Sequence, residues 1–246
     1  TPILIRAFAS KPALSEGNLP GIVQAHGLGG FAEESHATGL AALTGAFVIA
    51  YTGPGGGSEA NNTSEGRASG YGNGYRMFDT LVDPRGSWFW GHAVAAMRGI
   101  TCLETREEVD SQRIGMTGFS AGAVATLLVS GADPRVVAAV PLSGTLAWNI
   151  AVEAPNAWQH TLLQEAGLST SSSEWLTLIS ELILPTVALS QTNTKILMVN
   201  GTTDEFFPLT AHVETYNAIP GADKRTSLAA NFDHGCYGLT GVESAS

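Results

Sequence analysis

The sequence predicts an α/β fold in which a mostly parallel sheet carries helices on both faces. Short apolar runs alternate with helical patterns along most of the chain, as in proteins whose parallel strands are joined by crossover helices. One apolar run leads straight into the turn Gly118-Phe119-Ser120-Ala121-Gly122, and a helical pattern follows. At 246 residues, a single domain of this class accounts for the whole chain, 1–246.

Strands are expected where apolar residues run between turn signals. Residues 47–51 are apolar throughout, which is typical of a strand buried on both faces. Pro141 is expected to end the run at 136–140, because proline has no N–H for the strand ladder. The expected strands are 3–8, 21–26, 47–51, 113–117, 136–140, 195–200 and about 225–230.

Helices are expected between these strands. Asp83 followed by Pro84 predicts a helix start, because the carboxylate caps free N–H groups and proline fits the first turn. The segment 52–77 is rich in Gly, Ser and Asn and predicts a functional or mobile loop. The expected helices are 33–44, 85–106, 121–130 and 208–219.

Residues 145–193 break the alternation of strand and helix. Two or three helical patterns there hold Trp148, Trp158 and Trp175. We interpret this segment as a small cap or lid inserted after a strand. The alternative is a surface excursion that packs its own small core.

The composition limits the class of partner. Twelve Lys and Arg face 22 Asp and Glu, for a net charge of -10. An acidic surface repels phosphate backbones and anionic lipid, so we expect neither nucleic acid nor membrane as a partner. No apolar run approaches the roughly 18 residues needed to span a bilayer. The composition favours a neutral or weakly polar substrate and leaves the oligomeric state open.

The five residues around Ser120 match G-x-S-x-G, a pattern in which a strand turns sharply into a helix and exposes the serine hydroxyl. Here the pattern lies between an expected strand and an expected helix. The alternative is an ordinary glycine-rich turn. We predict that Ser120 is a nucleophile, which requires a base to accept its proton.

A nucleophile of this kind is followed in the chain first by an acid and then by a histidine. His160 falls in the predicted cap and His212 in a helical pattern, whereas His234 lies in a polar turn after the last strand. We therefore predict His234 as the base, the alternative being a surface histidine. Asp204, in the turn after 195–200, is the predicted orienting acid, and Glu205 and Asp233 are its competitors.

An acyl-transfer site also needs N–H groups that bind the oxyanion of the tetrahedral intermediate. The N–H of Ala121, directly after the nucleophile, is the first predicted donor. The second is expected from the loop His26-Gly27-Leu28-Gly29-Gly30, with Leu28 preferred and Gly29 as the alternative. His26 precedes the serine, so we interpret it as a buried structural histidine.

Neither a metal nor another cofactor is predicted. Asp, Glu and His show no ligand spacing, and the glycines at 53–57 lack the strand–loop–helix context of a dinucleotide site. We expect Cys102 and Cys236 to be free thiols, one of them buried in a helix, with a single bridge possible in an oxidising compartment.

Together these residues resemble the α/β-hydrolase superfamily over about residues 3–240. The run Val109-Asp110-Ser111-Gln112-Arg113-Ile114-Gly115 resembles the V-D-x-x-R-I-G segment of the dienelactone-hydrolase and acetyl-xylan-esterase branch and of prolyl-oligopeptidase-like catalytic domains. Asp204-Glu205-Phe206-Phe207-Pro208 resembles their D-x-x-V-P segment around the triad acid. Phe207 stands where Val is usual, and Ala123 follows Gly122 where a further Gly is usual. One strand before Gly21 replaces the usual two.

The resemblance implies an α/β-hydrolase fold and a cofactor-independent Ser-His-Asp triad. The predicted function is hydrolysis of a carboxylic ester, on a small or polymeric substrate, through an acyl-enzyme. A peptidase or amidase with the same triad, or a catalytically silent binding module, are the alternatives. The chain begins at Thr1 without Met or a signal peptide, so we expect a processed mature protein or part of a longer one. Scarce lysine with much Ser, Thr, Asn and Gly favours secretion over a cytoplasmic location.

Overall fold

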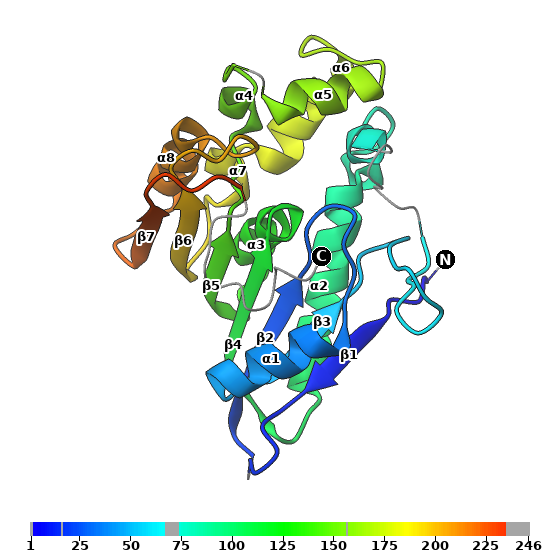
Figure 1. Ribbon diagram of the computed structural model, residues 1–246, viewed down its shortest axis with the longest axis vertical. Coiled ribbons are helices and arrows are strands. Elements are labelled where there is room, and N and C mark those ends of the chain that lie inside the picture. The colour runs from blue at the N-terminus through cyan, green and yellow to red at the C-terminus, as the bar shows by residue number, and fades with distance from the viewer. Residues whose placement is uncertain (1, 16, 67–73, 156, 235–246) are drawn as a thin grey trace.

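A seven-stranded sheet runs through the part of the chain that the computed structural model describes, residues 2–15, 17–66, 74–155 and 157–234 (Figure 1). Its strands are β1 (Ala7–Ser10), β2 (Leu19–Ala25), β3 (Phe47–Tyr51), β4 (Val109–Phe119), β5 (Val136–Leu142), β6 (Lys195–Gly201) and β7 (Lys224–Ala229). Their spatial order is β1-β3-β2-β4-β5-β6-β7. Within this sheet β1 is antiparallel to β3 and the other pairs are parallel, which confirms the predicted sheet.

Helices lie on both faces of the sheet, and β3 shows how its two faces differ. Val48 and Ala50 pack with Ala37 and Ala41 of α1 (Glu34–Thr44). The alternate residues of β3 join the main core, which includes α2 (Trp88–Glu104) and α3 (Ala121–Ala132). Because β2 to β7 run parallel, their carboxyl ends meet at one edge of the sheet, where ligands bind in open α/β sheets.

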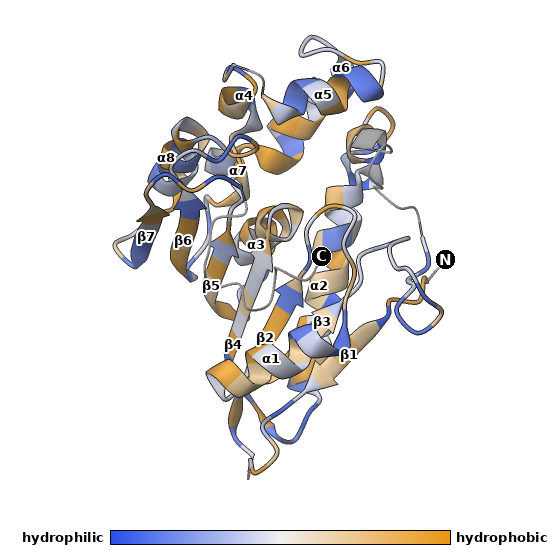
Figure 2. Cartoon of the chain, viewed as in Figure 1, coloured by the Kyte–Doolittle hydropathy of each residue, from blue (hydrophilic) through white to orange (hydrophobic). Residues whose placement is uncertain are grey.

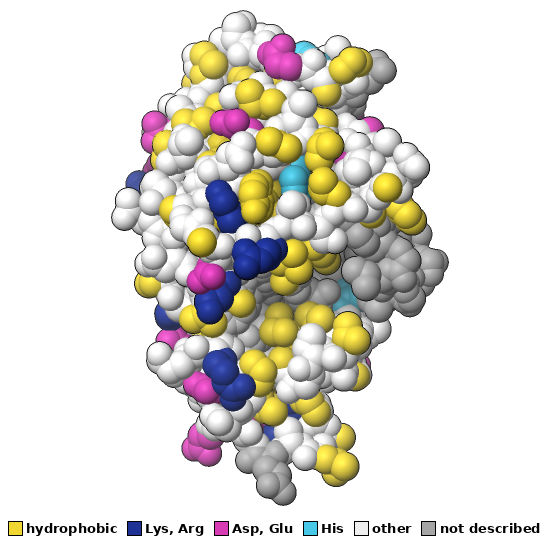
Figure 3. Space-filling view, turned by 90° about the vertical axis from the view of Figure 1, so that its left-hand side faces the viewer, with side chains coloured by type: hydrophobic (Ala, Val, Ile, Leu, Met, Phe, Trp, Pro, Cys, Tyr) yellow, Lys and Arg dark blue, Asp and Glu magenta, His cyan; other side chains and the backbone are white. Residues whose placement is uncertain are grey.

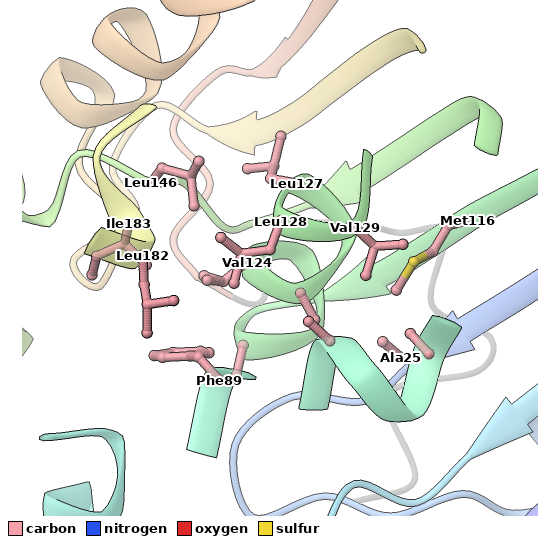
Figure 4. Packing of buried hydrophobic residues seen from close by; sticks show 14 of the residues in the cluster. Ala25, Phe89, Met116, Val124, Leu127, Leu128, Val129, Leu146, Leu182 and Ile183 are labelled. Atoms are coloured by element: carbon pink, nitrogen blue, oxygen red, sulfur yellow. The ribbon is translucent and has the colours of Figure 1, made fainter. Parts of the chain in front are cut away.

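The main core extends beyond the sheet into the inserted segment. Figure 4 shows Leu182 and Ile183 beside Val124 of α3 and Phe89 of α2, all of them in one buried cluster. The inserted helices between β5 and β6 are α4 (Trp148–Ala151), α5 (Trp158–Glu165), α6 (Ser173–Leu178), the π-helix η3 (Ile179–Ile183) and α7 (Pro185–Ala188). Trp148 and Trp175 are buried in the same cluster, so the insertion shares the core of the sheet.

The first strand begins later than predicted. Residues 3–6 were expected in a strand, but β1 starts at Ala7. The N–H of Leu4 donates to Glu65 Oε2 (2.9 Å), and that of Arg6 donates to Ser64 Oγ (2.9 Å). These residues therefore pair with the loop after β3 instead of with β3 itself.

Other boundaries also differ from the prediction, since β2 begins at Leu19 and β4 at Val109, both earlier than expected. Asp83 caps only the short 3₁₀ turn η2 (Pro84–Gly86), and α2 begins at Trp88 with Ser87 as its cap. Pro141 does not end its strand but lies inside β5, opposite Gly118 of β4. In the described register between β5 and β6, residue 141 forms no pair, so its missing N–H is tolerated there.

Cys102 lies on α2 as expected for a helical thiol, but it is exposed, so its predicted burial is wrong. It falls on the outward face of a helix whose inward face holds Ala96, Gly99, Ile100 and Leu103. Cys236 lies outside the described residues, and the pairing of the two thiols stays a prediction.

β7 is an outer strand of the described sheet and carries positive charge. It begins with Lys224 and Arg225, where Figure 2 shows a hydrophilic tip, and Figure 3 shows Lys and Arg side chains gathered on this side of the molecule. Lys224 Nζ donates to the carbonyls of Tyr216 (2.9 Å) and Ile219 (2.7 Å) at the end of α8 (Leu209–Ala218). Charged residues on an edge strand oppose pairing with another sheet. None of the helices in the described ranges is long and apolar enough to cross a bilayer.

Candidate active site

Ser120 occupies the sharp turn between β4 and α3. Its backbone has φ 57° and ψ -119°, a conformation that non-glycine residues rarely adopt. The flanking glycines make this turn possible by close packing. A Cβ on Gly122 would lie 2.2 Å from the carbonyl oxygen of Ala25, and one on Gly118 would lie 2.4 Å from that of Gly122. The sequence pattern thus corresponds to a strained, tightly packed elbow.

A continuous chain of hydrogen bonds joins Ser120 to Asp204. His234 Nε2 lies 3.0 Å from Ser120 Oγ, and His234 Nδ1 lies 3.0 Å from Asp204 Oδ2. A carboxylate can only accept, so Nδ1 carries a proton and Nε2 of the neutral ring is free to accept from the serine hydroxyl. These three residues follow β4, β6 and β7, whose carboxyl ends share one edge of the sheet.

The turn after β6 holds the acid in place. Asp204 is 3% exposed, and its Oδ1 accepts the N–H groups of Phe206 (2.9 Å) and Phe207 (2.8 Å). On the other side, a Cβ on Gly201 would lie 2.2 Å from the carbonyl oxygen of Phe232, so the end of β6 packs directly against the histidine loop. Acid and base are therefore fixed to each other through backbone contacts.

The other candidates are placed differently. Glu205 Oε2 accepts the backbone N–H of His234 (3.3 Å) instead of a ring proton. His160 is exposed on α5, and His212 is buried on α8 with its Nε2 2.7 Å from Thr226 Oγ1. Burial lowers the pKa of His212 to about 4, although Asp204 acts in the opposite direction. Among the described histidines, the structure brings His234 to Ser120.

The predicted oxyanion donors flank the serine. Ala121 is the first residue of α3, where N–H groups have no acceptor within the helix. Leu28 lies in a turn closed by the N–H of Gly30 donating to the carbonyl of Gly27 (3.1 Å), with Gly29 at φ 75°. That closing bond uses the N–H of Gly30, and the N–H of Leu28 takes no part in it. A Cβ on Gly27 would lie 3.3 Å from Ser120 Cβ, so the turn lies against the nucleophile.

These groups line one pocket of about 160 Å³. Its lining residues are Gly27, Leu28, Phe119, Ser120, Trp158, Phe206 and His234. Phe206 meets the His234 ring edge-to-face with centroids 4.5 Å apart, and Trp158 lies 5.2 Å from Phe206. The pocket therefore has a polar wall, formed by Ser120 and His234 at the sheet edge, and an aromatic wall opposite in character.

Sequence reasoning missed most of this wall. Phe206 lies two residues after the acid and Phe119 directly precedes the nucleophile, so their neighbours in the chain carried the available signal. Of the three tryptophans of the insertion, only Trp158 is among the lining residues of this pocket. Trp158 lines the pocket, whereas Trp148 lies behind it, 5.4 Å from Phe89 and 5.8 Å from Trp158.

Within the described ranges, no three His, Cys, Asp or Glu side chains are grouped so that they could hold a metal ion. The predicted absence of a metal and of another cofactor stays a prediction.

Comparison with known proteins identifies relatives of this chain. The family model described as acetyl xylan esterase (AXE1) matches residues 3–239. No curated protein sequence matches. Among solved structures, the chain is similar to the acetyl xylan esterase from Paenibacillus sp. R4, with a TM-score of 0.78 and 20% identity over 96% of this chain and 76% of that one.

Acetyl Xylan Esterase 1 from Thermoanaerobacterium sp. JW/SL YS485 has a TM-score of 0.74 at 20% identity, again over 96% of this chain and 76% of that one. The acylaminoacyl peptidase from Pyrococcus horikoshii has a TM-score of 0.66 at 16% identity, over 96% of this chain and 38% of that one. These likenesses confirm the predicted α/β-hydrolase fold. Together with the family match, they confirm the predicted resemblance to acetyl xylan esterases and to peptidases of the same fold.

Proposed function

The chain belongs to the acetyl xylan esterase family and is a carboxylic ester hydrolase, and on this premise we propose that Ser120, His234 and Asp204 form its catalytic triad. The observation that carries the proposal is the hydrogen-bond chain from Ser120 Oγ through both nitrogens of His234 to Asp204. Each member has the contact that its role requires. The serine meets an acceptor nitrogen, and the ring meets a buried carboxylate.

In the proposed reaction, Ser120 Oγ attacks the ester carbonyl carbon while His234 Nε2 takes the hydroxyl proton. The carbonyl oxygen becomes an oxyanion, which the N–H groups of Ala121 and Leu28 stabilise. Collapse of this intermediate breaks the bond to the alcohol oxygen, and the imidazolium returns the proton to that oxygen. Water then attacks the acyl-enzyme by the same route and releases the carboxylic acid and free Ser120.

We infer that the acyl group is short. The pocket of about 160 Å³ is small beside the roughly 300–1,000 Å³ of typical ligand sites. Phe119, Phe206 and Trp158 enclose it. Both acetyl xylan esterases above act on acetyl groups of a carbohydrate by their names, and we extend an acetylated carbohydrate to this chain as the substrate class.

The test is a matched panel of p-nitrophenyl acetate, butyrate and octanoate, acetylated xylan, and an aminoacyl anilide. We expect the highest kcat/KM on acetate, release of acetate from the xylan, and loss of these activities after treatment with a fluorophosphonate. A preference for the anilide would point to a peptidase or amidase instead. Binding of acetylated xylan without turnover would point to a silent binding module.

A further inference from the structure

The turn that carries Leu28 is held by two histidines outside the triad, of which His92 is buried and His26 is half-buried. His26 follows β2 and directly precedes Gly27. His92 lies on α2, is 0% exposed, and stacks on the ring of Trp88 with centroids 4.4 Å apart. The two imidazole centroids are 5.0 Å apart. Neither ring belongs to the proposed triad, so their presence beside the turn needs a separate explanation.

The contacts of His26 fix its tautomer. The N–H of Gly53 donates to His26 Nε2 (2.8 Å), so this nitrogen carries no proton. In the neutral ring the proton is then on Nδ1, which lies 2.6 Å from the carbonyl oxygen of Gly27 and donates to it. Burial lowers the pKa of His26 to about 4, which keeps the ring neutral near pH 7.

The contacts of His92 fix the opposite tautomer. Its Nε2 lies 3.3 Å from the carbonyl oxygen of His26, which can only accept, so this nitrogen carries the proton. Its Nδ1 is then unprotonated and lies 3.3 Å from the hydroxyl oxygen of Tyr51, whose proton is donated to the carbonyl oxygen of His92 (2.9 Å). A Cβ on Gly53 would lie 2.5 Å from His92 Nδ1, so the ring is also packed tightly against the strand-end loop.

The rings of His26 and His92 thereby fix the directions of two consecutive peptide groups, 26–27 and 27–28. In a planar trans peptide, the C=O and the N–H point in opposite directions. The Gly27 carbonyl accepts from both His26 Nδ1 and the N–H of Gly30, and these bonds fix the direction of the Leu28 N–H. The bond from His92 to the His26 carbonyl fixes the preceding peptide in the same way.

We propose that His92 is a positioning residue for ester hydrolysis, which acts through His26 to hold the Leu28 N–H where the oxyanion forms. The inference rests on the proposed function, because it needs Ser120 as nucleophile and Leu28 as a donor. It assigns a catalytic consequence to two side chains that do not themselves line the pocket.

The experiment compares His92→Gln with His92→Asn. A Gln amide nitrogen reaches the position of Nε2 and can donate to the His26 carbonyl, whereas an Asn amide reaches only the position of Nδ1. We expect His92→Asn to lower kcat on p-nitrophenyl acetate about 10- to 100-fold with KM within about twofold, since removal of a whole oxyanion donor costs about 10²–10³. We expect His92→Gln to keep kcat within about threefold.

The control is Thr194→Val, which removes a buried hydroxyl that donates to the carbonyls of Ser130 (3.2 Å) and Val136 (2.8 Å), away from the turn. It should lower the thermal unfolding temperature without changing kcat. If His92→Asn and His92→Gln fold and both keep the kcat of the parent enzyme, the proposal is overturned.

Nitrogen-15 NMR of the unmodified protein provides a test that needs no variant. His26 should be protonated at Nδ1 and His92 at Nε2, and either opposite tautomer refutes the proposal. Ser120→Ala, assayed in parallel, distinguishes a failure of the proposed function from a failure of the proposed role of His92. Hydrolysis that persists in Ser120→Ala contradicts the proposed function, whereas Ser120-dependent hydrolysis with full activity in His92→Asn contradicts this inference alone.

Discussion

The two walls of the pocket are built by different means. The sheet-edge wall, defined by Ser120 and His234 with Asp204 buried behind them, comes from turns at the ends of parallel strands and is fixed by backbone packing and hydrogen bonds. The aromatic wall, defined by Phe119, Phe206 and Trp158, is held by ring contacts and receives Trp158 from the insertion. We propose that the first wall sets whether an ester reacts, and the second sets which ester fits.

The largest effect is expected from Ser120→Ala on the sheet-edge wall. The substitution removes the nucleophilic oxygen and should lower kcat by about 10⁴–10⁶ while the fold is kept. Steady-state assays on p-nitrophenyl acetate measure kcat, fluorophosphonate labelling reports on the nucleophile, and circular dichroism checks the fold. Retained activity with labelling at a different serine would show that the nucleophile is elsewhere.

Asp204→Asn tests the acid on the same wall. The amide removes the negative charge and favours the wrong tautomer of His234, which we expect to cost about 10⁴ in kcat. Glu205→Gln is the matched comparison, because Glu205 accepts the backbone N–H of His234 and not a ring proton, and it should cost less than about tenfold in kcat. A larger loss for Glu205→Gln than for Asp204→Asn would mean that the acid has been misassigned.

Stability at acid pH tests the packing of three histidines around the sheet. Burial lowers the pKa of His26 and of His212 to about 4, and it also lowers that of His92. Between about pH 6.5 and 4, the unfolded chain therefore binds more protons than the folded one, and the free energy of unfolding falls as the pH falls. Each of the first two contributes about 3 kcal/mol over this range.

Urea unfolding at pH 7, 6, 5 and 4.5 measures this dependence. His212→Gln should reduce the slope by about 1.4 kcal/mol per pH unit, the value for one proton. Thr194→Val, which removes a buried but uncharged group, should leave the slope as it is. A free energy of unfolding that stays constant from pH 6.5 to 4.5 would contradict buried neutral histidines.

Substitutions in the aromatic wall are expected to have the smallest effect on kcat. They are the ones expected to change the selectivity for the acyl chain. We propose that the insertion at 145–193 shapes the acyl pocket through Trp158. Trp158→Ala should widen the pocket and raise the octanoate-to-acetate ratio of kcat/KM about tenfold. Trp148→Ala, behind the wall and 0% exposed, should lower stability by about 3–5 kcal/mol with little change in that ratio. An equal change of the ratio in both variants, in step with lost stability, would refute a pocket role for the insertion.

The same contrast explains what the sequence could predict. The succession of strands along the chain and the positions of Ser120, Asp204 and His234 follow from apolar runs and turn residues. Such runs and turns are properties of short contiguous segments. The position of Phe206 in the pocket wall was not predicted, because it depends on which side of the turn the side chain lies. No local sequence pattern determines that side. The start of α2 was misplaced because Asp83 and Ser87 both have capping chemistry, and only tertiary packing decides between them.

The turn that holds Asp204 has a consequence for how selectivity in this protein can evolve. The carboxylate is anchored by the N–H groups of Phe206 and Phe207, and Phe206 is at the same time a wall of the pocket. A substitution that remodels this turn to admit a new acyl group would also disturb the anchor of the acid. Trp158 belongs to a separate helix and contacts this turn through its ring, whereas its neighbour Gln159 donates to the Phe206 carbonyl (2.9 Å). A combinatorial library that spares 204–207 and Gln159 and varies 158 with the other residues of its helix should therefore yield variants with altered acyl preference at a higher frequency than a library of equal size centred on the turn.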